Sequence, residues 1–139
     1  LEVAAVLTTL GDVRCAAHDA AGGEQALARA LSIFESVSPD HVELAVARAA
    51  LARCWLAHGR VDDALALLRR AREVGDAATP TEEVELALAD AMWRAGSDRP
   101  AALTMASGAY ARLRALDNGL AAEAAAWIGA RDPSWRPTP

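Results

Sequence analysis

Lysine is absent from this sequence of 139 residues, so all 14 of its basic side chains are arginines, against 19 aspartates and glutamates. The formal net charge is −5 at pH 7. Surfaces that bind nucleic acids or anionic membranes are rich in basic side chains, so the acidic balance argues against both kinds of partner. Abundant alanine and arginine without lysine indicate a bacterial genome rich in G and C.

Cysteine is scarce as well, with only Cys15 and Cys54 in the chain. Secreted domains that depend on disulfides use more cysteines and place them in loops, whereas these two lie in segments with helical spacing. We therefore expect two free, buried thiols and a cytoplasmic location. A zinc site with His18 and His58 is an alternative, but the two Cys–His pairs hold different positions in the repeats described below, so we expect them not to meet. No metal and no cofactor is predicted.

Aromatic residues make up only 4% of the chain, strand-forming residues are sparse, and 53% of the residues are hydrophobic. No apolar run reaches the roughly 20 residues of a membrane-spanning helix, and no signal peptide is visible. There is also no glycine-rich phosphate loop and no set of nucleophile, base and orienting residue. The composition predicts one all-α domain without catalytic activity.

The clearest local pattern lies between residues 51 and 71, where a glycine separates two apolar stripes with helical spacing. The stripes are Leu51, Ala52, Trp55 and Leu56, and then Ala64, Leu65, Leu68 and Ala71. Gly59 can adopt the left-handed conformation that ends a helix, and Asp62 and Asp63 suit the positive end of the next helix dipole. The segment predicts a helical hairpin.

The hairpin that begins at Leu51 has counterparts 41 residues earlier, at Leu10, and 37 residues later, at Leu88. A helical hairpin that recurs with a period near 40 predicts a stacked solenoid. The central hairpin resembles the tetratricopeptide repeat family through Leu51, Ala52, Trp55, Gly59, Ala64, Leu68 and Ala71. The first repeat departs from this pattern at Arg14, His18 and Gly23.

The resemblance implies a right-handed α-solenoid of three helical hairpins with a C-terminal capping helix. We expect the array to span residues 1–131, with repeats at about 1–38, 39–78 and 79–118, the capping helix at 119–131, and an extended or disordered tail at 132–139. The junction at Pro39, Asp40 and His41 is similar to the long-period variety in kinesin light chains. Asp40, Thr79 and either Ser97 or Asp98 are expected to cap helices.

Two further expectations concern the first hairpin and the tail. The first helix is expected to bury Val3, Val6, Leu7, Leu10 and Val13, and the turn after it to span Asp19 to Gly23. Trp135, between prolines in the tail, either docks on a groove or is disordered.

In this family the first helix of each hairpin lines a concave groove. Transferred to this chain, the groove positions are Ala5, Thr8, Asp12, Cys15, Val46, Ala49, Arg53, Leu56, Glu83, Leu86, Asp90, Trp93 and Arg94. Trp93 and Leu56 are candidates for apolar anchors of a bound peptide or helix, and Arg53 and Arg94 for cations that bind its carboxylates. Alternatively, the two arginines pair with Asp12 and Asp90 on a solvated face. The clamp that binds Hsp70 and Hsp90 tails is absent, so such tails are not expected partners.

These observations favour a non-catalytic scaffold for protein–protein interaction. The chain starts inside a helical pattern without an initiator methionine, and its end resembles the C-terminal repeats of large bacterial regulatory proteins. We therefore expect a fragment of such a protein. The alternatives are a self-association module, in which the open end of the stack pairs between copies through apolar residues such as Val3, Val6 and Leu7, and a regulatory segment of an enzyme such as a serine/threonine kinase.

Overall fold

The computed structural model describes residues 1–37, 42–73, 81–116 and 119–137. In these residues the backbone forms seven α-helices, one 3₁₀ turn and no strand, which confirms the predicted all-α class. The elements are α1 (Glu2–Ala16), α2 (Ala20–Val37), α3 (Val42–Ala57), α4 (Val61–Glu73), α5 (Thr81–Ala95), α6 (Arg99–Leu113), η1 (Arg114–Leu116) and α7 (Gly119–Arg131). The predicted caps Asp40 and Thr79 and the Pro39–His41 junction lie outside the described residues.

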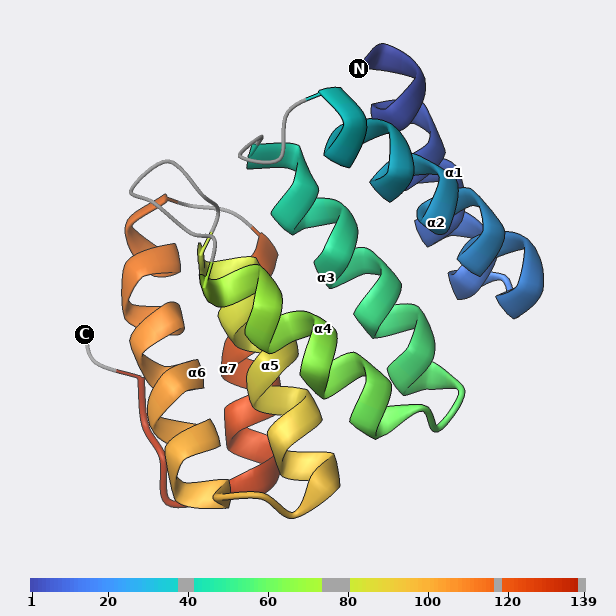
Figure 1. Ribbon diagram of the computed structural model, residues 1–139. Coiled ribbons are helices and arrows are strands. Elements are labelled where there is room, and N and C mark those ends of the chain that lie inside the picture. The colour runs from blue at the N-terminus through green and yellow to red at the C-terminus, as the bar shows by residue number, and fades with distance from the viewer. Residues whose placement is uncertain (38–41, 74–80, 117–118, 138–139) are drawn as a thin grey trace.

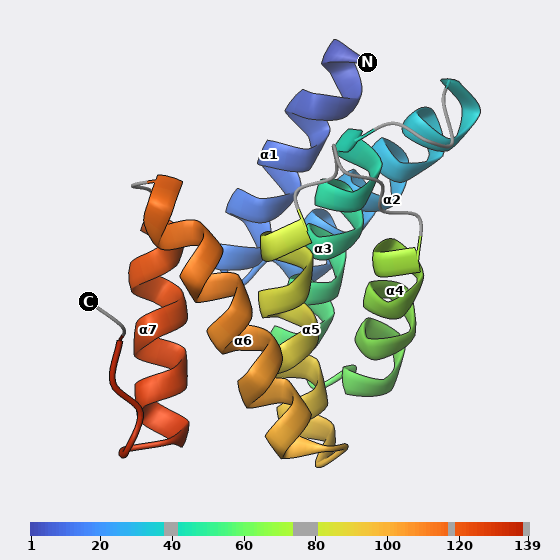
Figure 2. The ribbon, with the colours of Figure 1, turned by 90° about the vertical axis from the view of Figure 1, so that its left-hand side faces the viewer.

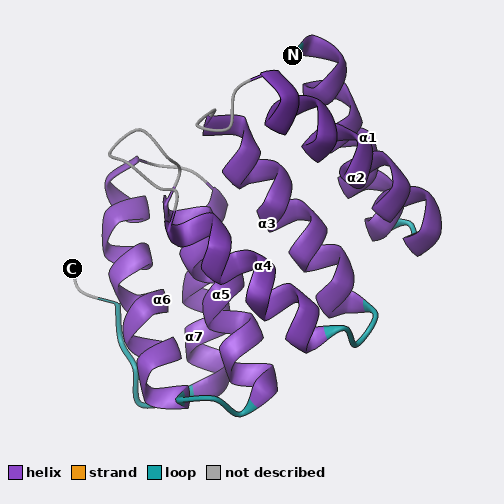
Figure 3. Ribbon diagram, viewed as in Figure 1, coloured by secondary structure: helices purple, strands orange, loops and turns teal. Residues whose placement is uncertain are grey.

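The helices stack as three successive hairpins, α1 with α2, α3 with α4 and α5 with α6 (Figure 1). Each helix packs on the next one in the chain, and α3 also contacts both α1 and α5. The first helices of the hairpins therefore form one layer, and α2 and α4 lie on the other side of it (Figure 2). The described loops between the helices are short (Figure 3).

The core is divided among the interfaces between neighbouring hairpins, as expected of a helical repeat. One cluster joins α2 and α3 around Leu27, Phe34 and Leu51. A second joins α3, α4 and α5 and contains most of the apolar residues of the predicted central hairpin. A third joins α5, α6 and α7 around Ile128. None of the described helices is both long and apolar enough to cross a bilayer.

The turn between α1 and α2 is shorter than predicted. The expected turn from Asp19 to Gly23 is wrong, because α2 begins at Ala20 and contains Gly23. His18 has a φ of +66°, in the left-handed region that Gly59, with a φ of +81°, adopts after α3. Asp19 then accepts a hydrogen bond of 3.0 Å from the backbone N–H of Gly22, which satisfies one free donor of the first turn of α2.

The glycines of the first hairpin allow α1 and α2 to approach closely. A Cβ atom on Gly23 would lie 2.3 Å from Sγ of Cys15 and 3.0 Å from the carbonyl oxygen of Gly11. A Cβ atom on Gly11 would lie 2.4 Å from the side chain of Leu27. The departure from the family pattern at Gly23 therefore has a steric cause, because no larger residue fits between the two helices.

The predicted apolar face of α1 is wrong. The helix buries Ala4, Thr8 and Gly11 instead, because small side chains are needed where it packs against α2 and α3. Of the expected inward residues only Leu7 is partly buried. The other four are exposed: Val3 by 60%, Val6 by 66%, Leu10 by 38% and Val13 by 60%.

The segment after α7 folds back along α6 (Figure 1). Trp135 packs against Tyr110 with the ring centroids 5.2 Å apart and the planes nearly perpendicular. Its backbone N–H donates to the carbonyl of Asp132, whose carboxylate accepts from Ser134. Of the two alternatives for Trp135, the structure therefore shows packing, but on α6 and not in a groove.

Candidate functional site

An open groove of about 690 Å³ runs across the layer of first helices. Four helices contribute its lining: Asp12, Cys15 and Ala16 from α1; Arg53, Cys54 and Ala57 from α3; Glu83, Leu86, Ala87 and Asp90 from α5; and Leu120, Glu123, Ala124 and Trp127 from α7. The groove residues predicted from the sequence lie in the first helices, and six of them line this cavity. They are Asp12, Cys15, Arg53, Glu83, Leu86 and Asp90.

The remaining predicted positions do not line the groove. Thr8 is only 7% exposed, and its hydroxyl donates to the carbonyl of Ala4. Leu56 is 3% exposed in the core between α3 and α5. Neither side chain is therefore accessible to a bound segment, so the prediction of Thr8 as a groove position and that of Leu56 as an anchor are both wrong. Ala5, Val46, Ala49, Trp93 and Arg94 are likewise absent from the lining.

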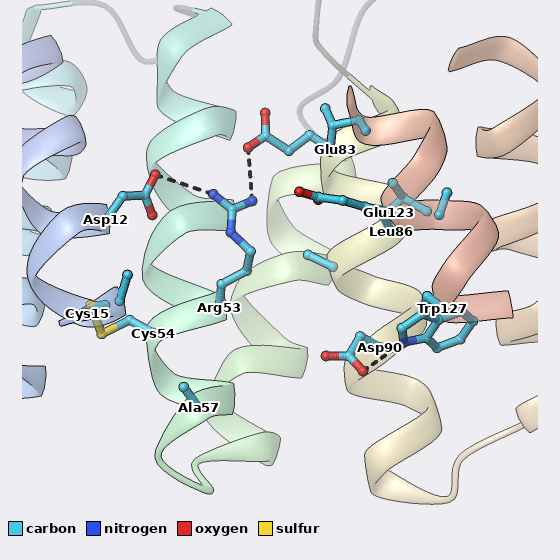
Figure 4. A pocket seen from close by; sticks show the side chains of 14 residues that line it. Asp12, Cys15, Arg53, Cys54, Ala57, Glu83, Leu86, Asp90, Glu123 and Trp127 are labelled. Carbon is cyan, nitrogen blue, oxygen red and sulfur yellow. Dashed lines mark hydrogen bonds and ion pairs between the residues drawn. A yellow bond between two sulfur atoms is a disulfide. The ribbon is translucent and has the colours of Figure 1, made fainter. Parts of the chain in front are cut away.

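The cysteines form a disulfide between α1 and α3 in the groove wall (Figure 4). The expectation of two free thiols is wrong, and so is the expectation that the two cysteines do not meet. Neighbouring repeats follow one another along the stack, so the first helix of each repeat contacts the next repeat with one face and the previous repeat with the opposite face. Helix α1 therefore meets α3 through a face that does not correspond to the face with which α3 meets α1. A contacting pair must therefore occupy non-equivalent repeat positions, as Cys15 and Cys54 do. The argument for a cytoplasmic location, which depended on free thiols, no longer holds.

Oxidation also leaves no thiolate for the alternative zinc site. His58 lies at the end of α3, where its Nδ1 is 2.7 Å from the carbonyl oxygen of Cys54. Across the described ranges, no three His, Cys, Asp or Glu side chains are grouped so that they would hold a metal ion.

Arg53 lies between two carboxylates on neighbouring helices (Figure 4). Its guanidinium is 3.5 Å from Asp12 of α1 and 2.9 Å from Glu83 of α5. The arginine is thus engaged inside the molecule, as in the alternative in which it pairs with Asp12. It is not a free cation for an incoming carboxylate.

Asp90 is the centre of a second polar cluster. It accepts a hydrogen bond of 3.0 Å from the indole N–H of Trp127 and pairs with Arg94 at 3.1 Å and with Arg131 at 3.6 Å. Arg94 also donates to the carbonyl of Leu56. The alternative in which Arg94 pairs with Asp90 is therefore the one that the structure shows.

Trp93 packs against Trp127 with ring centroids 6.0 Å apart. The guanidinium of Arg99 lies 4.9 Å from the Trp93 ring, so cation–π attraction adds to the contact. Trp93 thus supports the α7 wall of the groove from outside the lining.

Glu24 of α2 connects the first two hairpins. It accepts hydrogen bonds from the indole of Trp55 at 3.1 Å and from Arg60 at 2.8 Å. The bond from Trp55, then that from Arg60, lowers the pKa of the Glu24 carboxyl below its ordinary value. The same ion pair raises the pKa of Arg60, whose guanidinium also stacks 4.5 Å over the Trp55 ring.

The α7 wall was missed by the sequence reasoning, which assigned this helix only a capping role. A signal was present, because the four α7 residues of the lining each stand 37 positions after a lining residue of α5. The differences are 120 − 83, 123 − 86, 124 − 87 and 127 − 90. The same spacing separates Leu51 from Leu88. Helix α7 therefore takes the place of a first helix in a fourth unit.

The family model for the tetratricopeptide repeat matches residues 2–77, more than half of the chain. The matched part contains α1 to α4, and the third hairpin and α7 continue the same arrangement beyond it. No curated protein and no solved structure gives a significant match.

Proposed function

Because this chain belongs to the tetratricopeptide repeat family, whose repeats generally mediate protein–protein interaction, we propose that it is a non-catalytic scaffold that holds a peptide or helix in the groove. The observation that carries this proposal is the groove itself, to which four helices contribute. Extended concave surfaces of this kind are where stacked repeats bind their partners. The net charge of −5 supports a protein partner over nucleic acid or an anionic membrane.

The repeat variety and the parent protein are proposed from the sequence. The spacing of 41 residues between the first two units supports the long-period variety similar to kinesin light chains. We propose a role within a larger bacterial regulatory protein, with a regulatory segment of a serine/threonine kinase as the alternative. The sequence of the complete gene decides between them.

Peptide selection tests the proposed groove directly. Peptides selected from a random display library on the intact chain should bind less tightly to Leu86→Glu, by about tenfold or more, because a buried carboxylate opposes apolar contact. Ala66→Glu, on the exposed side of α4, should leave the affinity unchanged. Selected peptides that bind both variants as tightly as the parent would place the binding surface outside the groove.

A second function, self-association, is favoured by the exposed apolar face of α1. Val3, Val6, Leu10 and Val13 lie on this helix with large exposed fractions. Contiguous apolar surface of this kind marks an interaction site. We propose a second copy of the chain as its occupant.

A further inference from the structure

The charges of the groove are divided unevenly between its ends. Asp12 and Glu83 pair with Arg53, and Glu123 extends from α7 into the same part of the groove (Figure 4), so this part holds three negative groups and one positive group. The net charge of this group of four is therefore −2 by addition. At the other end, Asp90 is already paired with two arginines and with the indole of Trp127. Unbalanced negative charge is confined to the end near Arg53.

Glu123 differs from the other two carboxylates in this group. Asp12 and Glu83 each pair with Arg53. Glu123 is exposed and extends from α7 into the groove (Figure 4), and its side chain makes no ion pair or hydrogen bond with a described residue. A carboxylate in a concave site with apolar walls attracts cations more strongly than one on an open surface, because the walls reduce solvent screening.

Apolar surface lies beside the acidic end. Leu86 of α5 and Leu120 of α7, both partly exposed, supply it together with Cys15 of the disulfide. The buried Ala87, Ala124 and Cys54 complete the apolar lining. A ligand that fits both parts carries a positive charge next to a short apolar stripe. Lysine and arginine on an amphipathic helix present this combination, because their stems lie along apolar surface while the charged group extends beyond it.

We propose that the groove recognises a cationic, amphipathic protein segment, with Glu123 and the Asp12–Arg53–Glu83 group receiving its lysine or arginine. This reverses the charge expected from the sequence, where Arg53 and Arg94 were to bind carboxylates of the partner. Both arginines are instead held by carboxylates of the chain itself. The proposal rests on the proposed function of the groove and specifies its partner.

Three synthetic peptides of about 18 residues, long enough to form a helix, test the charge preference. They share one Ala/Leu sequence and differ only at one set of positions, which carries Lys, Gln or Glu. Binding is measured by isothermal titration calorimetry, and the indole N–H resonance of Trp127 reports whether the groove is occupied. We expect the Lys peptide to bind about tenfold more tightly than the Glu peptide at low salt and to lose this advantage at high salt.

Glu123→Gln and Glu73→Gln form a matched pair of variants. The first removes the unpaired carboxylate of the groove, and the second makes the same chemical change at an exposed residue of α4 outside the lining. Glu123→Gln should weaken the Lys peptide by about three- to tenfold and leave the Gln peptide unchanged. Glu73→Gln should change neither affinity.

The outcomes separate the two proposals. If all three peptides shift the Trp127 resonance with equal affinity, or the Glu peptide binds best, the cationic partner is wrong while the groove remains a binding site. If no peptide shifts this resonance at any accessible concentration, both the cationic partner and the proposed function of the groove are wrong.

Discussion

The contact between Gly23 and Cys15 shows how a missing side chain can determine helix packing. In the second repeat the equivalent position is Ala64, which is fully buried. In the first repeat a methyl group at Gly23 would collide with a sulfur that the disulfide holds in place. Helices α1 and α2 can lie this close only because the residue is glycine.

Gly23→Ala should therefore destabilise the fold by about 1–3 kcal/mol, the usual cost of overpacking. Gly129→Ala is the control, because a Cβ atom there meets nothing within 4 Å. In the last turn of α7 this change should stabilise the chain by up to about 1 kcal/mol, because alanine favours helix over glycine. Urea denaturation measures both. A Gly23→Ala variant as stable as the parent would mean that α1 and α2 lie farther apart.

Glu24 predicts a pH dependence. Its pKa is lowered in the folded chain, so it contributes stability above the ordinary pKa of a glutamate, and this contribution is lost as the pH falls through the folded pKa. The side chain is 41% exposed, and solvent screening keeps the contribution below about 1 kcal/mol. Glu24→Gln should therefore reduce the free energy of unfolding at pH 7, and the difference from the parent should shrink in acid. A difference that is constant from pH 7 to pH 3 would contradict the role of the ion pair.

At the scale of the helices, the disulfide joins α1 and α3, which are otherwise held together by packing and by the Asp12–Arg53 ion pair. It closes a loop between residues 39 positions apart in the sequence. A cross-link stabilises the folded state chiefly by restricting the unfolded chain. The first two hairpins therefore unfold together more readily in reducing than in oxidising conditions.

Reduction should lower the free energy of unfolding by about 3–4 kcal/mol, the size expected for a loop of this length. Denaturation with and without a phosphine reductant measures the change. The double variant Cys15→Ser and Cys54→Ser should be equally stable in both conditions. A thiol titration that finds two free thiols in the folded, air-oxidised chain would contradict the disulfide.

At the scale of the whole molecule, stacked repeats have ends, and the α1 end has an apolar surface that no described helix covers (Figure 1). If a second copy occupies this surface, the average mass in light scattering should rise with concentration. Val6→Asp should abolish the rise, because a charge would be buried in the contact. Val37→Asp, at an equally exposed valine of α2, should not. A parent chain that is monomeric at every concentration would exclude self-association through α1.

Local pattern was sufficient for part of this structure. The helix-ending Gly59, the acidic first turn of α4 and the buried stripe of Ala64, Leu65, Leu68 and Ala71 are all as predicted. Asp98, one of two candidate caps, accepts a hydrogen bond from the N–H of Ala101. Each of these features depends on residues within one or two helical turns, which is the range over which periodicity and capping act.

Periodicity did not determine which face α1 presents to the core, because the helical spacing of its valines is compatible with a buried or an exposed face. The close crossing of α1 and α2 at Gly11 and Gly23 requires that the face with small residues be the buried one. Periodicity likewise did not determine which side chains line the groove. The amino-acid sequence by itself determined the helices, their pairing and the layer that carries the groove, because those follow from repeating local contacts. Only the tertiary structure decided that Cys15 meets Cys54, that Arg53 is neutralised from both sides and that α7 forms a wall, because each depends on side chains brought together from different helices.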